Sequence, residues 1–398
     1  MSPCPSSPSW ARGADRAKAL AKILHILAER AWSGGEMQLE ALVHFLAEKG
    51  HKQIFALQPG AQFEKVPRAL GLRVLEQRMR NDLSLGALRG LRNIVKAEAP
   101  DLLHFACSRS HKLGGVASIG LSPVKVVTRR MDYALRPNPW KRWLYCKAVD
   151  GVVCVSAAVQ GEVLGLGVPP SRARLVHDGV DSARFAGLAF SDRRRAARTA
   201  LGLDPQAFVG LTTASLHRRK GQDILLQALA LLAPRLSIRK LQWVFAGEGP
   251  QGDALRAQAA SLPGSIEVLF PGRVSRIEDL LAASDLFCLP SRREGLGVAL
   301  LEAMAAGLPV IASKVGGMIE AFEDPESGRH VPPEDPASLA EAILSLETDP
   351  EKARAMGRRA AERCRESFDL RRMCRDTEAF YLELLAGSQA SNHDGEAI

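Results

Sequence analysis

Residues 284–312 decide the fold of this chain, and they read SDLFCLPSRREGLGVALLEAMAAGLPVIA. The pattern predicts a buried strand over 286–289, a polar loop with two glycines, a short helix and a second buried strand over 310–312. Gly297 precedes the helix and Gly307 follows it, as helix boundaries require. Strand, helix and strand in this order are typical of a parallel sheet covered by helices, so we expect an α/β fold.

Two carboxylates occupy the loop and the helix of this stretch. Glu302 lies inside the predicted helix among apolar neighbours, where an unpaired charge is costly, so it is expected to be paired or to face an opening. Glu294 lies in the loop before the helix, whose first backbone N–H groups lack partners and favour a bound anion. These groups belong to Gly295, Leu296, Gly297 and Val298. The stretch therefore suits a nucleotide sugar, unless Glu294 is a solvated loop residue and Glu302 a paired structural acid.

The spacing of the two glutamates carries a family resemblance. Residues 290–310 follow the pattern Pro-Ser-x-x-Glu-Gly-x-Gly-x-x-x-x-Glu-Ala-x-Ala-x-Gly-x-Pro-Val, which resembles the signature of retaining glycosyltransferases of family four. That family has the GT-B fold, in which two Rossmann-like doubly wound domains face a cleft. The resemblance implies that Glu294 faces the donor sugar and that Glu302 holds the ribose of the nucleotide. It covers about 23–385 and is strongest over 210–333.

Length and composition agree with two globular domains. The chain has 398 residues, too many for one ordinary core, and 46% of them are hydrophobic. No segment approaches the ~20 uncharged apolar residues that span a bilayer, and the N-terminus lacks the apolar run of a signal peptide. Seven scattered cysteines without metal-ligand spacing indicate reduced thiols. We therefore expect a cytoplasmic protein without metal or other cofactor.

The charge is uneven. The formal net charge is +9, and residues 1–186 carry the whole excess of basic side chains. A basic first half indicates an anionic partner, either membrane headgroups, a phosphorylated acceptor or nucleic acid, and no nucleic-acid motif supports the last. The segment PNPWKRWLYCK over 137–147 suits a bilayer surface, unless its aromatic side chains face the core. We expect a glycan or glycolipid acceptor and contact with the inner face of the cytoplasmic membrane.

A glycine turn opens the first half. The pattern predicts a strand over 23–27, a helix over 37–49 and a strand over 54–57, with Gly34 and Gly35 in the first turn. Glycines there let the backbone approach a ligand, although neither the dinucleotide fingerprint nor the P-loop is present. The turn resembles a loop of the family's acceptor-side domain that comes close to the donor phosphates. The alternative is an ordinary turn between strand and helix.

Three polar residues follow or lie in later strands of the first half. Arg130 and Asp132 follow the predicted strand 124–128, and open α/β sheets bind ligands at such ends. We expect Arg130 to neutralise a phosphate and Asp132 to orient an acceptor hydroxyl, unless they are a surface charge and a turn residue. Many family members carry a histidine near Arg130. His104 lies in a Pro-Asp-Leu-Leu-His run similar to one of the family, either as an acceptor-binding residue or as a hydrogen-bonded core residue.

The loop ASLHRRKG over 214–221 opens the second half. It resembles the family loop whose Arg and Lys grip the donor diphosphate. Lys220 matches the pattern, but Ser215 stands where the Arg is expected, so Arg219 or Arg130 is expected to supply the second cation. A departing nucleoside diphosphate gains charge and needs such groups. The alternative is a solvated basic turn.

Two shorter runs complete the resemblance. It places the nucleotide base against the backbone near Arg273 and Val274, within PGRV over 271–274. The run HDGVD over 177–181 resembles the Asn-Gly-Val-Asp that closes the first domain in the family, with Asp178 in place of Asn.

The domain boundaries follow from these matches. Residues 21–186 are expected to form an acceptor-binding domain and 187–370 a nucleotide-sugar-binding domain. Residues 371–386 are expected to form a helix that returns to the first domain. The segments 1–20 and 387–398 are polar and are expected to be disordered tails.

The resemblance implies a glycosyltransferase (EC 2.4). It would move a sugar from a UDP-, GDP- or ADP-sugar with retention, in lipopolysaccharide or other cell-envelope glycan synthesis. A nucleotide-sugar epimerase on the same scaffold is one alternative, but it would need clustered acids and histidines in the first domain, which are not found. A sugar-nucleotide-binding protein without turnover is the other, and the departures at Ser215, Ala106 and Arg130 leave it open.

Overall fold

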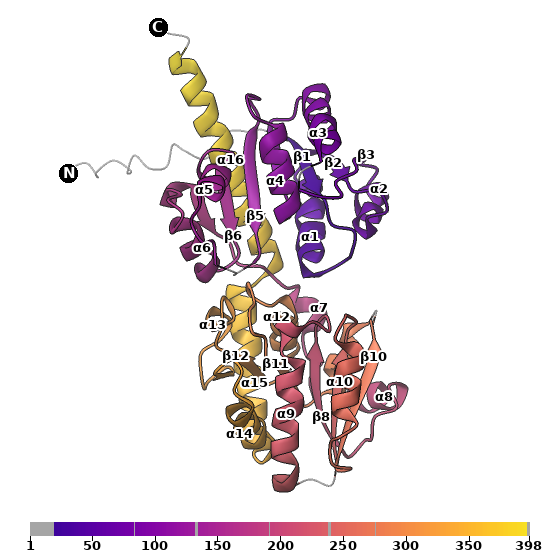
Figure 1. Ribbon diagram of the computed structural model, residues 1–398. Helices are drawn as coiled ribbons and strands as arrows, with labels where there is room; N and C mark the ends of the chain where they lie inside the picture. Colours follow the sequence, from indigo (N-terminus) through magenta and orange to yellow (C-terminus); the bar gives the residue numbers. More distant parts are fainter. Residues whose placement is uncertain are drawn as a thin grey trace, which may run out of the picture.

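The computed structural model describes residues 20–395, with the exceptions of 83, 132–133, 191, 238–239 and 275. Two lobes are stacked end to end, and each is a parallel β-sheet flanked by helices (Figure 1). This arrangement confirms the predicted α/β class with two Rossmann-like doubly wound domains.

The N-terminal lobe holds seven strands in the order β3-β2-β1-β4-β5-β6-β7. The strands are β1 (Lys22–Leu27), β2 (Lys52–Leu57), β3 (Arg73–Glu76), β4 (Leu102–Phe105), β5 (Val124–Arg129), β6 (Gly151–Cys154) and β7 (Ala173–Leu175). The helices are α1 (Gly34–Glu48), α2 (Lys65–Ala69), α3 (Leu85–Glu98), α4 (Ser108–Ala117), α5 (Pro139–Cys146) and α6 (Ala157–Leu164). The central strands are buried along nearly their whole length, because helices cover both faces of a parallel sheet.

The C-terminal lobe holds six strands in the order β10-β9-β8-β11-β12-β13. The strands are β8 (Phe208–Thr213), β9 (Leu241–Ala246), β10 (Ile266–Gly272), β11 (Leu286–Leu289), β12 (Val310–Ser313) and β13 (Arg329–Val331). The helices are α7 (Ser182–Phe185), α8 (Arg193–Ala200), α9 (Gln222–Leu232), α10 (Gly252–Ala259), α11 (Ile277–Ala283), α12 (Val298–Ala306), α13 (Met318–Ala321), α14 (Pro336–Glu347) and α15 (Pro350–Ser367). Strand order reverses between β1 and β4 in one lobe and between β8 and β11 in the other, and ligands of open α/β sheets bind at such points.

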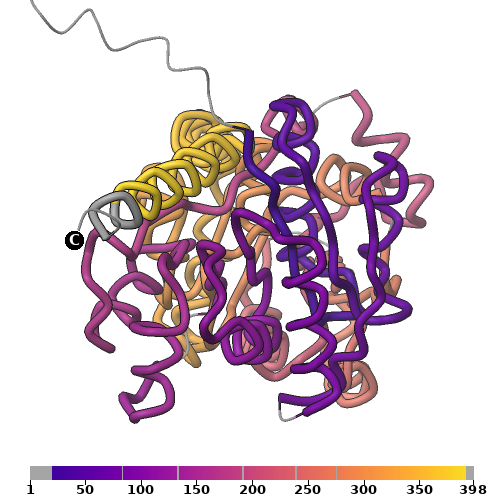
Figure 2. Tube along the Cα trace, turned by 90° about the horizontal axis from the view of Figure 1, so that it is seen from above, coloured from indigo at the N-terminus to yellow at the C-terminus, as the bar shows by residue number. Residues whose placement is uncertain are grey.

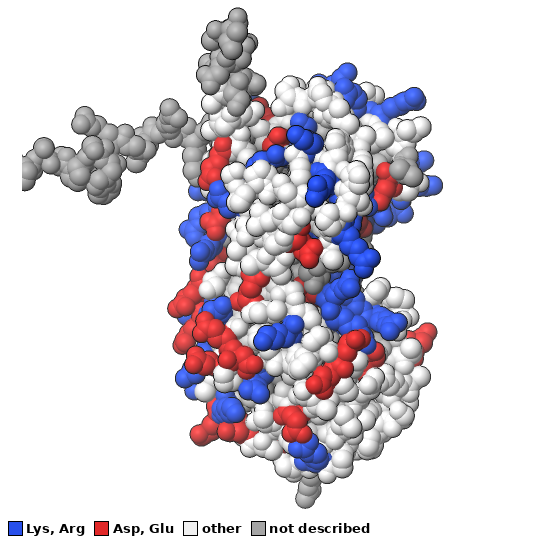
Figure 3. Space-filling view, turned by 60° about the vertical axis from the view of Figure 1, so that its left-hand side comes forward, with Lys and Arg blue, Asp and Glu red and all other residues white. Residues whose placement is uncertain are grey.

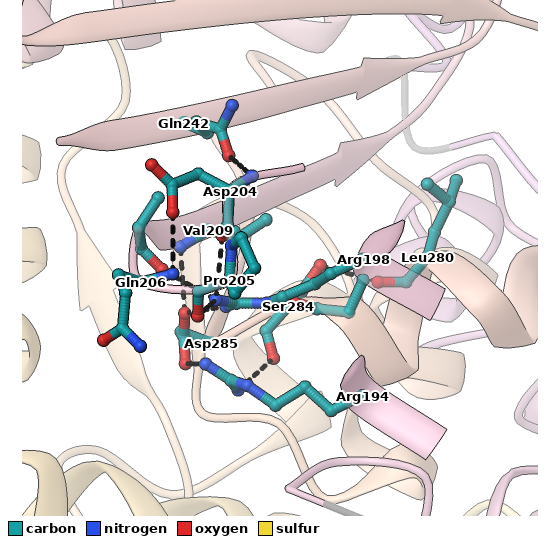
Figure 4. A network of polar contacts seen from close by, with 12 residues as sticks. Arg194, Arg198, Asp204, Pro205, Gln206, Val209, Gln242, Leu280, Ser284 and Asp285 are labelled. Carbon is teal, nitrogen blue, oxygen red and sulfur yellow. Dashed lines mark hydrogen bonds and ion pairs between the residues drawn. The ribbon is translucent and has the colours of Figure 1, made fainter. Parts of the chain in front are cut away.

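An arginine network fixes the amino ends of β8 and β11 (Figure 4). The buried Arg198 of α8 donates to three backbone carbonyls of the 204–207 segment and to Asp285, 2.7 Å away. Asp285 also pairs with Arg194 and accepts from the Val209 amide at 2.9 Å. The arginine-rich linker is therefore anchored at the amino ends of β8 and β11. The loops that carry candidate residues follow the carboxyl ends of the same two strands.

The last helix, α16 (Leu370–Gly395), returns to the N-terminal lobe. It lies along one side of that lobe when the molecule is viewed from above (Figure 2). Gly151 permits this contact, since a Cβ there would lie 2.5 Å from Leu384 and 2.8 Å from Phe380. The prediction of disorder from residue 387 is corrected, because the helix continues to Gly395. No proline interrupts it, and extending an existing helix adds one hydrogen bond per residue.

Over the part of the chain that the structure describes, no helix is both long and apolar enough to cross a bilayer.

Candidate functional site

Loops from the carboxyl ends of both sheets meet between the lobes. A Cβ added at Gly34 would lie 3.4 Å from the Val298 side chain, and one added at Gly35 would lie 3.4 Å from Arg130. At Gly295 an added Cβ would lie only 2.1 Å from the Arg130 carbonyl oxygen, so glycine is required there. The start of α1 therefore faces the start of α12. Figure 3 shows the molecule hollowed between the lobes, with Lys and Arg side chains at the margins of the hollow.

The start of α12 is suited to an anion. Gly297 occupies the position before the helix with a φ of 91°, and no side chain caps the helix. The amides of Val298 and Ala299 begin the first turn, where intrahelical acceptors are lacking. By contrast, Ser33 and Glu36 cap α1 reciprocally: the Glu36 carboxylate accepts from the Ser33 amide at 2.8 Å. Of the two facing helices, α12 offers the freer N-terminus for phosphate.

Lys220 and Glu294 form an ion pair at the end of β11. The Lys220 ammonium donates to the Glu294 carboxylate, which also accepts from the Ser291 hydroxyl at 3.3 Å. The Lys220 and Glu294 side chains are only 13% and 12% exposed. Gly221 has a φ of 70°, and a Cβ there would lie 1.9 Å from the Pro290 carbonyl oxygen. This close approach places the basic loop after β8 beside the loop that carries Glu294.

Arg130 and Asp178 form a second ion pair. The Arg130 guanidinium donates to the buried Asp178 carboxylate. Burial raises the pKa of Asp178, and Arg130 acts in the opposite direction. Asp178 stands where the resembling family sequence has Asn, and Arg130 lies near the place where many members carry a His; in the structure these two residues contact each other. Sequence reasoning missed Asp178 as a site residue, although the gain of two opposite charges at Arg130 and Asp178 was a usable signal.

Three further candidate residues line the same region. A guanidinium nitrogen of Arg219 lies 3.5 Å from the sulfur of Met131, the residue that follows Arg130 in the sequence. Arg273 crosses between the lobes and donates to the Trp32 carbonyl at 3.1 Å, one residue before the cap of α1. Val274 packs against the apolar cluster that includes α12.

Glu302 is buried without a hydrogen bond. Its exposed fraction is 7%, and none of the residues that the structure describes donates a hydrogen bond to its carboxylate. The nearby Arg184 donates instead to Glu278, at 2.8 Å. Burial raises the pKa of Glu302 to about 7, although Arg184 opposes the shift. Arg184 thus acts on this carboxylate through its charge and not through a hydrogen bond.

His104 does not join the cluster. Its exposed fraction is 1%, its Nε2 lies 2.9 Å from the Thr128 hydroxyl, and its Nδ1 lies 3.0 Å from Nδ1 of His25. Burial lowers its pKa well below the ordinary value. This placement favours the second interpretation, a hydrogen-bonded core residue. Asp132 lies outside the described residues.

The described part of the chain holds no group of three or more His, Cys, Asp or Glu side chains arranged to bind a metal ion.

Comparisons with known proteins identify the family of the chain. The model Glycosyltransferase Family 4 matches residues 32–184, and the model Glycosyl transferases group 1 matches residues 193–363. A D-inositol 3-phosphate glycosyltransferase of Streptomyces bingchenggensis is 34% identical over 230 residues, which are 56% of this chain and 50% of the relative. The putative glycosyltransferase EpsD of Bacillus subtilis is 32% identical over 250 residues, which are 62% of this chain and 64% of EpsD. The chain thus spans about half the length of the first of these relatives.

Solved structures share the fold. Anabaena HepE in complex with UDP and glucose superposes with a TM-score of 0.75 at 22% identity, over 90% of this chain and 98% of HepE. A glycosyltransferase of Rickettsia africae gives a TM-score of 0.79 at 20% identity, over 92% of this chain and 99% of the other. Because the two family models together match most of the chain and the two-lobed fold is that of these structures, the protein belongs to the group 1, family 4 glycosyltransferases of the GT-B fold.

Proposed function

We propose that this protein is a retaining glycosyltransferase that moves a sugar from a nucleotide sugar to a glycan or glycolipid acceptor. The observation that carries the proposal is the Glu302 carboxylate, buried on α12 without a hydrogen bond. A carboxylate in that state is costly unless a ligand supplies donors, and the two ribose hydroxyls of a nucleotide are such donors.

The remaining groups fit the other parts of the donor. The diphosphate would lie against the amides of Gly295 to Val298, with Lys220, Arg219 and Arg130 as its cations. Gly34 and Gly35 would border it from the other lobe. Glu294 would accept hydroxyls of the donor sugar, and the base would lie near Val274. UDP is the favoured nucleotide, because the similarly folded HepE binds UDP and glucose.

The chemistry follows from these positions. The bond between the anomeric carbon and the donor phosphate breaks, and the leaving diphosphate takes the electron pair and gains charge. Cations and helix amides aimed at it stabilise that charge more in the transition state than in the ground state. The acceptor oxygen bonds to the same carbon, and its proton passes to a phosphate oxygen of the leaving group. Closed lobes would exclude water and limit hydrolysis.

The proposed acceptor is inferred from the exposed residues of α5. Trp140 is 47% exposed, and its ring stacks on that of Trp143 with 5.2 Å between centroids. Arg142, which precedes Trp143 in the sequence, is exposed. Tyr145 is buried, and its hydroxyl accepts a hydrogen bond from the Arg129 guanidinium at 2.9 Å. Trp143 is half-buried and packs against the core of the lobe, so only Trp140 of this pair is exposed. An exposed tryptophan among basic side chains suits an anionic bilayer surface. The acceptor would then be a glycolipid, such as a lipopolysaccharide core or another cell-envelope glycan, at the inner face of the cytoplasmic membrane.

A turnover assay tests the proposal. The protein is incubated with UDP-, GDP- and ADP-sugars and a glycolipid extract, and released nucleotide and product anomer are measured. We expect release from UDP-sugars, an α-linked product from an α-linked donor, and a loss of about 10²–10³ in kcat for Lys220→Ala. Lys96→Ala, on the exposed face of α3, is the matched control. Nucleotide binding without release would favour the silent binding protein, and an epimerised sugar nucleotide would favour the epimerase.

A further inference from the structure

Each lobe neutralises its own phosphate-binding cation. Arg130 is paired with Asp178 in the N-terminal lobe, and Lys220 with Glu294 in the C-terminal lobe. The two carboxylates also affect each other, because Glu294 contributes to raising the pKa of Asp178. A diphosphate entering this cluster would therefore meet two cations that carboxylates already hold in place.

The backbone that carries Asp178 is clamped. Gln38 of α1 donates its amide to the Gly179 carbonyl at 2.8 Å and accepts from the Gly179 amide at 2.9 Å. A Cβ at Gly179 would lie 2.6 Å from Cα of Leu370, at the start of α16. The loop is thus held by two helices, and the Asp178 carboxylate has a fixed position from which to orient its partner.

Arg130 has donor capacity left over. Asp178 takes one terminal nitrogen, whereas Nε of Arg130 is buried without a hydrogen-bond partner among the described residues. A Cβ at Gly35 would lie 3.6 Å from that Nε, so this edge of the guanidinium faces the first turn of α1. A buried unsatisfied donor is costly, and an anion at this place would satisfy it.

We propose that Asp178 is a positioning residue, which holds Arg130 with its free edge toward the donor diphosphate. The assignment rests on the proposed function, because it names how one cation of that site is oriented. Asp178 does not contact the donor itself. It acts through Arg130, whose long side chain would otherwise have many rotamers to lose on binding.

A double-mutant cycle on UDP affinity tests this role. Calorimetric dissociation constants are measured for wild type, Asp178→Ala, Arg130→Ala and the double variant, with thermal melting as the check of folding. We expect each single change to weaken UDP binding about tenfold or more, and the double variant to bind no more weakly than Arg130→Ala. Asp178→Asn, which keeps an oxygen acceptor for the guanidinium, is expected to retain most of the affinity. Should an alanine variant fail to fold, Arg130→Gln and Asp178→Leu, which has no acceptor for the guanidinium, complete the cycle.

The outcomes separate the two proposals. If wild type binds neither UDP nor another nucleoside diphosphate, the proposed function and the positioning role both fall. If wild type binds UDP and Asp178→Ala binds it equally well, only the positioning role falls. The same holds if the effects of the two single changes simply add, since a residue that acts through Arg130 has nothing to act on in its absence.

Discussion

At the scale of the residue, the Glu302 carboxylate is proposed to favour nucleotide binding, but its burial lowers the stability of the fold. Its pKa is raised to about 7 by burial, so the folded state binds the proton more tightly than the unfolded state does. The stabilising contribution of that proton is full below the unfolded value of 4.5 and is lost as pH rises through about 7. Above that range the buried charge costs about 3 kcal/mol.

Glu302→Gln should therefore stabilise the ligand-free protein while it weakens nucleotide binding. We expect a free energy of unfolding higher by about 1–3 kcal/mol at pH 8, almost no gain at pH 5, and UDP affinity lower by about tenfold. Urea unfolding at both pH values and calorimetry measure the two effects. Glu326→Gln, at an exposed position, is the control. A variant that is less stable at pH 8 and binds UDP normally would contradict this role.

Single residues also show what the sequence could and could not predict. Local glycine and proline patterns place Lys220 in the loop after β8, Glu294 in the loop after β11 and Glu302 inside α12, so these three positions were predictable. Asp178 was missed because its partner, Arg130, lies 48 residues away in the sequence. Taken alone, each of these two residues shows only that the residue usual in the family is absent. His104 stayed undecided because both faces of a parallel strand are buried, so alternation cannot show which way a side chain points.

At the scale of the element, the short helix α13 of the C-terminal lobe meets the start of α6 in the N-terminal lobe. Glu320 accepts from the Ala157 amide at 2.9 Å and from the Ala158 amide at 3.2 Å, and it lies 2.9 Å from Nε2 of His177. Burial alone would raise the pKa of Glu320, but these hydrogen bonds lower it. The carboxylate thus joins the lobes at the positive end of a helix.

Replacing this carboxylate should loosen the closed arrangement. For Glu320→Ala we expect a loss of about 1–2 kcal/mol of interlobe interaction, a larger radius of gyration in solution scattering, and a higher KM for the donor. Glu323→Ala, whose carboxylate pairs with Arg363 within the same lobe, is the control. An unchanged radius and an unchanged KM would show that α13 does not hold the lobes together.

The elements themselves were largely predictable, but their ends were not. Apolar runs located β1, β2, β11 and β12 to within one or two residues of the observed bounds. The end of α16 was placed too early, because a polar sequence lowers helix propensity without stopping a helix that packing has already started.

At the scale of the whole molecule, the two lobes differ in their response to acid. The N-terminal lobe buries three neutral histidines, and burial lowers the pKa of both His25 and His111 to about 3 and that of His104 well below its ordinary value. A histidine with a lowered folded pKa stabilises the fold fully above its unfolded value of 6.5. That stability is lost as pH falls from 6.5 toward the folded value.

Acid should therefore open the N-terminal lobe first. Three such histidines cost it about 4 kcal/mol per pH unit below 6.5, whereas the protonation of Glu302 acts in the opposite direction in the other lobe. Hydrogen exchange by mass spectrometry at pH 7 and pH 5, corrected for intrinsic rates, measures the effect. We expect protection lost in β1, β4 and α4 before β8 and β11. Equal loss in both lobes, or none, would contradict this account.

The arrangement of the lobes was the least predictable feature. Pattern and spacing indicate two doubly wound domains, but the contacts of Gly295 with Arg130 and of Arg273 with Trp32 join segments 165 and 241 residues apart. Such contacts leave no local periodicity in the sequence. The meeting of the starts of α1 and α12 therefore had to come from the structure.

A crystal structure of the protein with UDP bound tests the central claim most directly. The account predicts the ribose hydroxyls within hydrogen-bond distance of the Glu302 carboxylate, and the diphosphate over the first amides of α12 with Lys220 and Arg130 turned onto it. A nucleotide bound elsewhere, with Glu302 still buried and without a hydrogen bond, would contradict it.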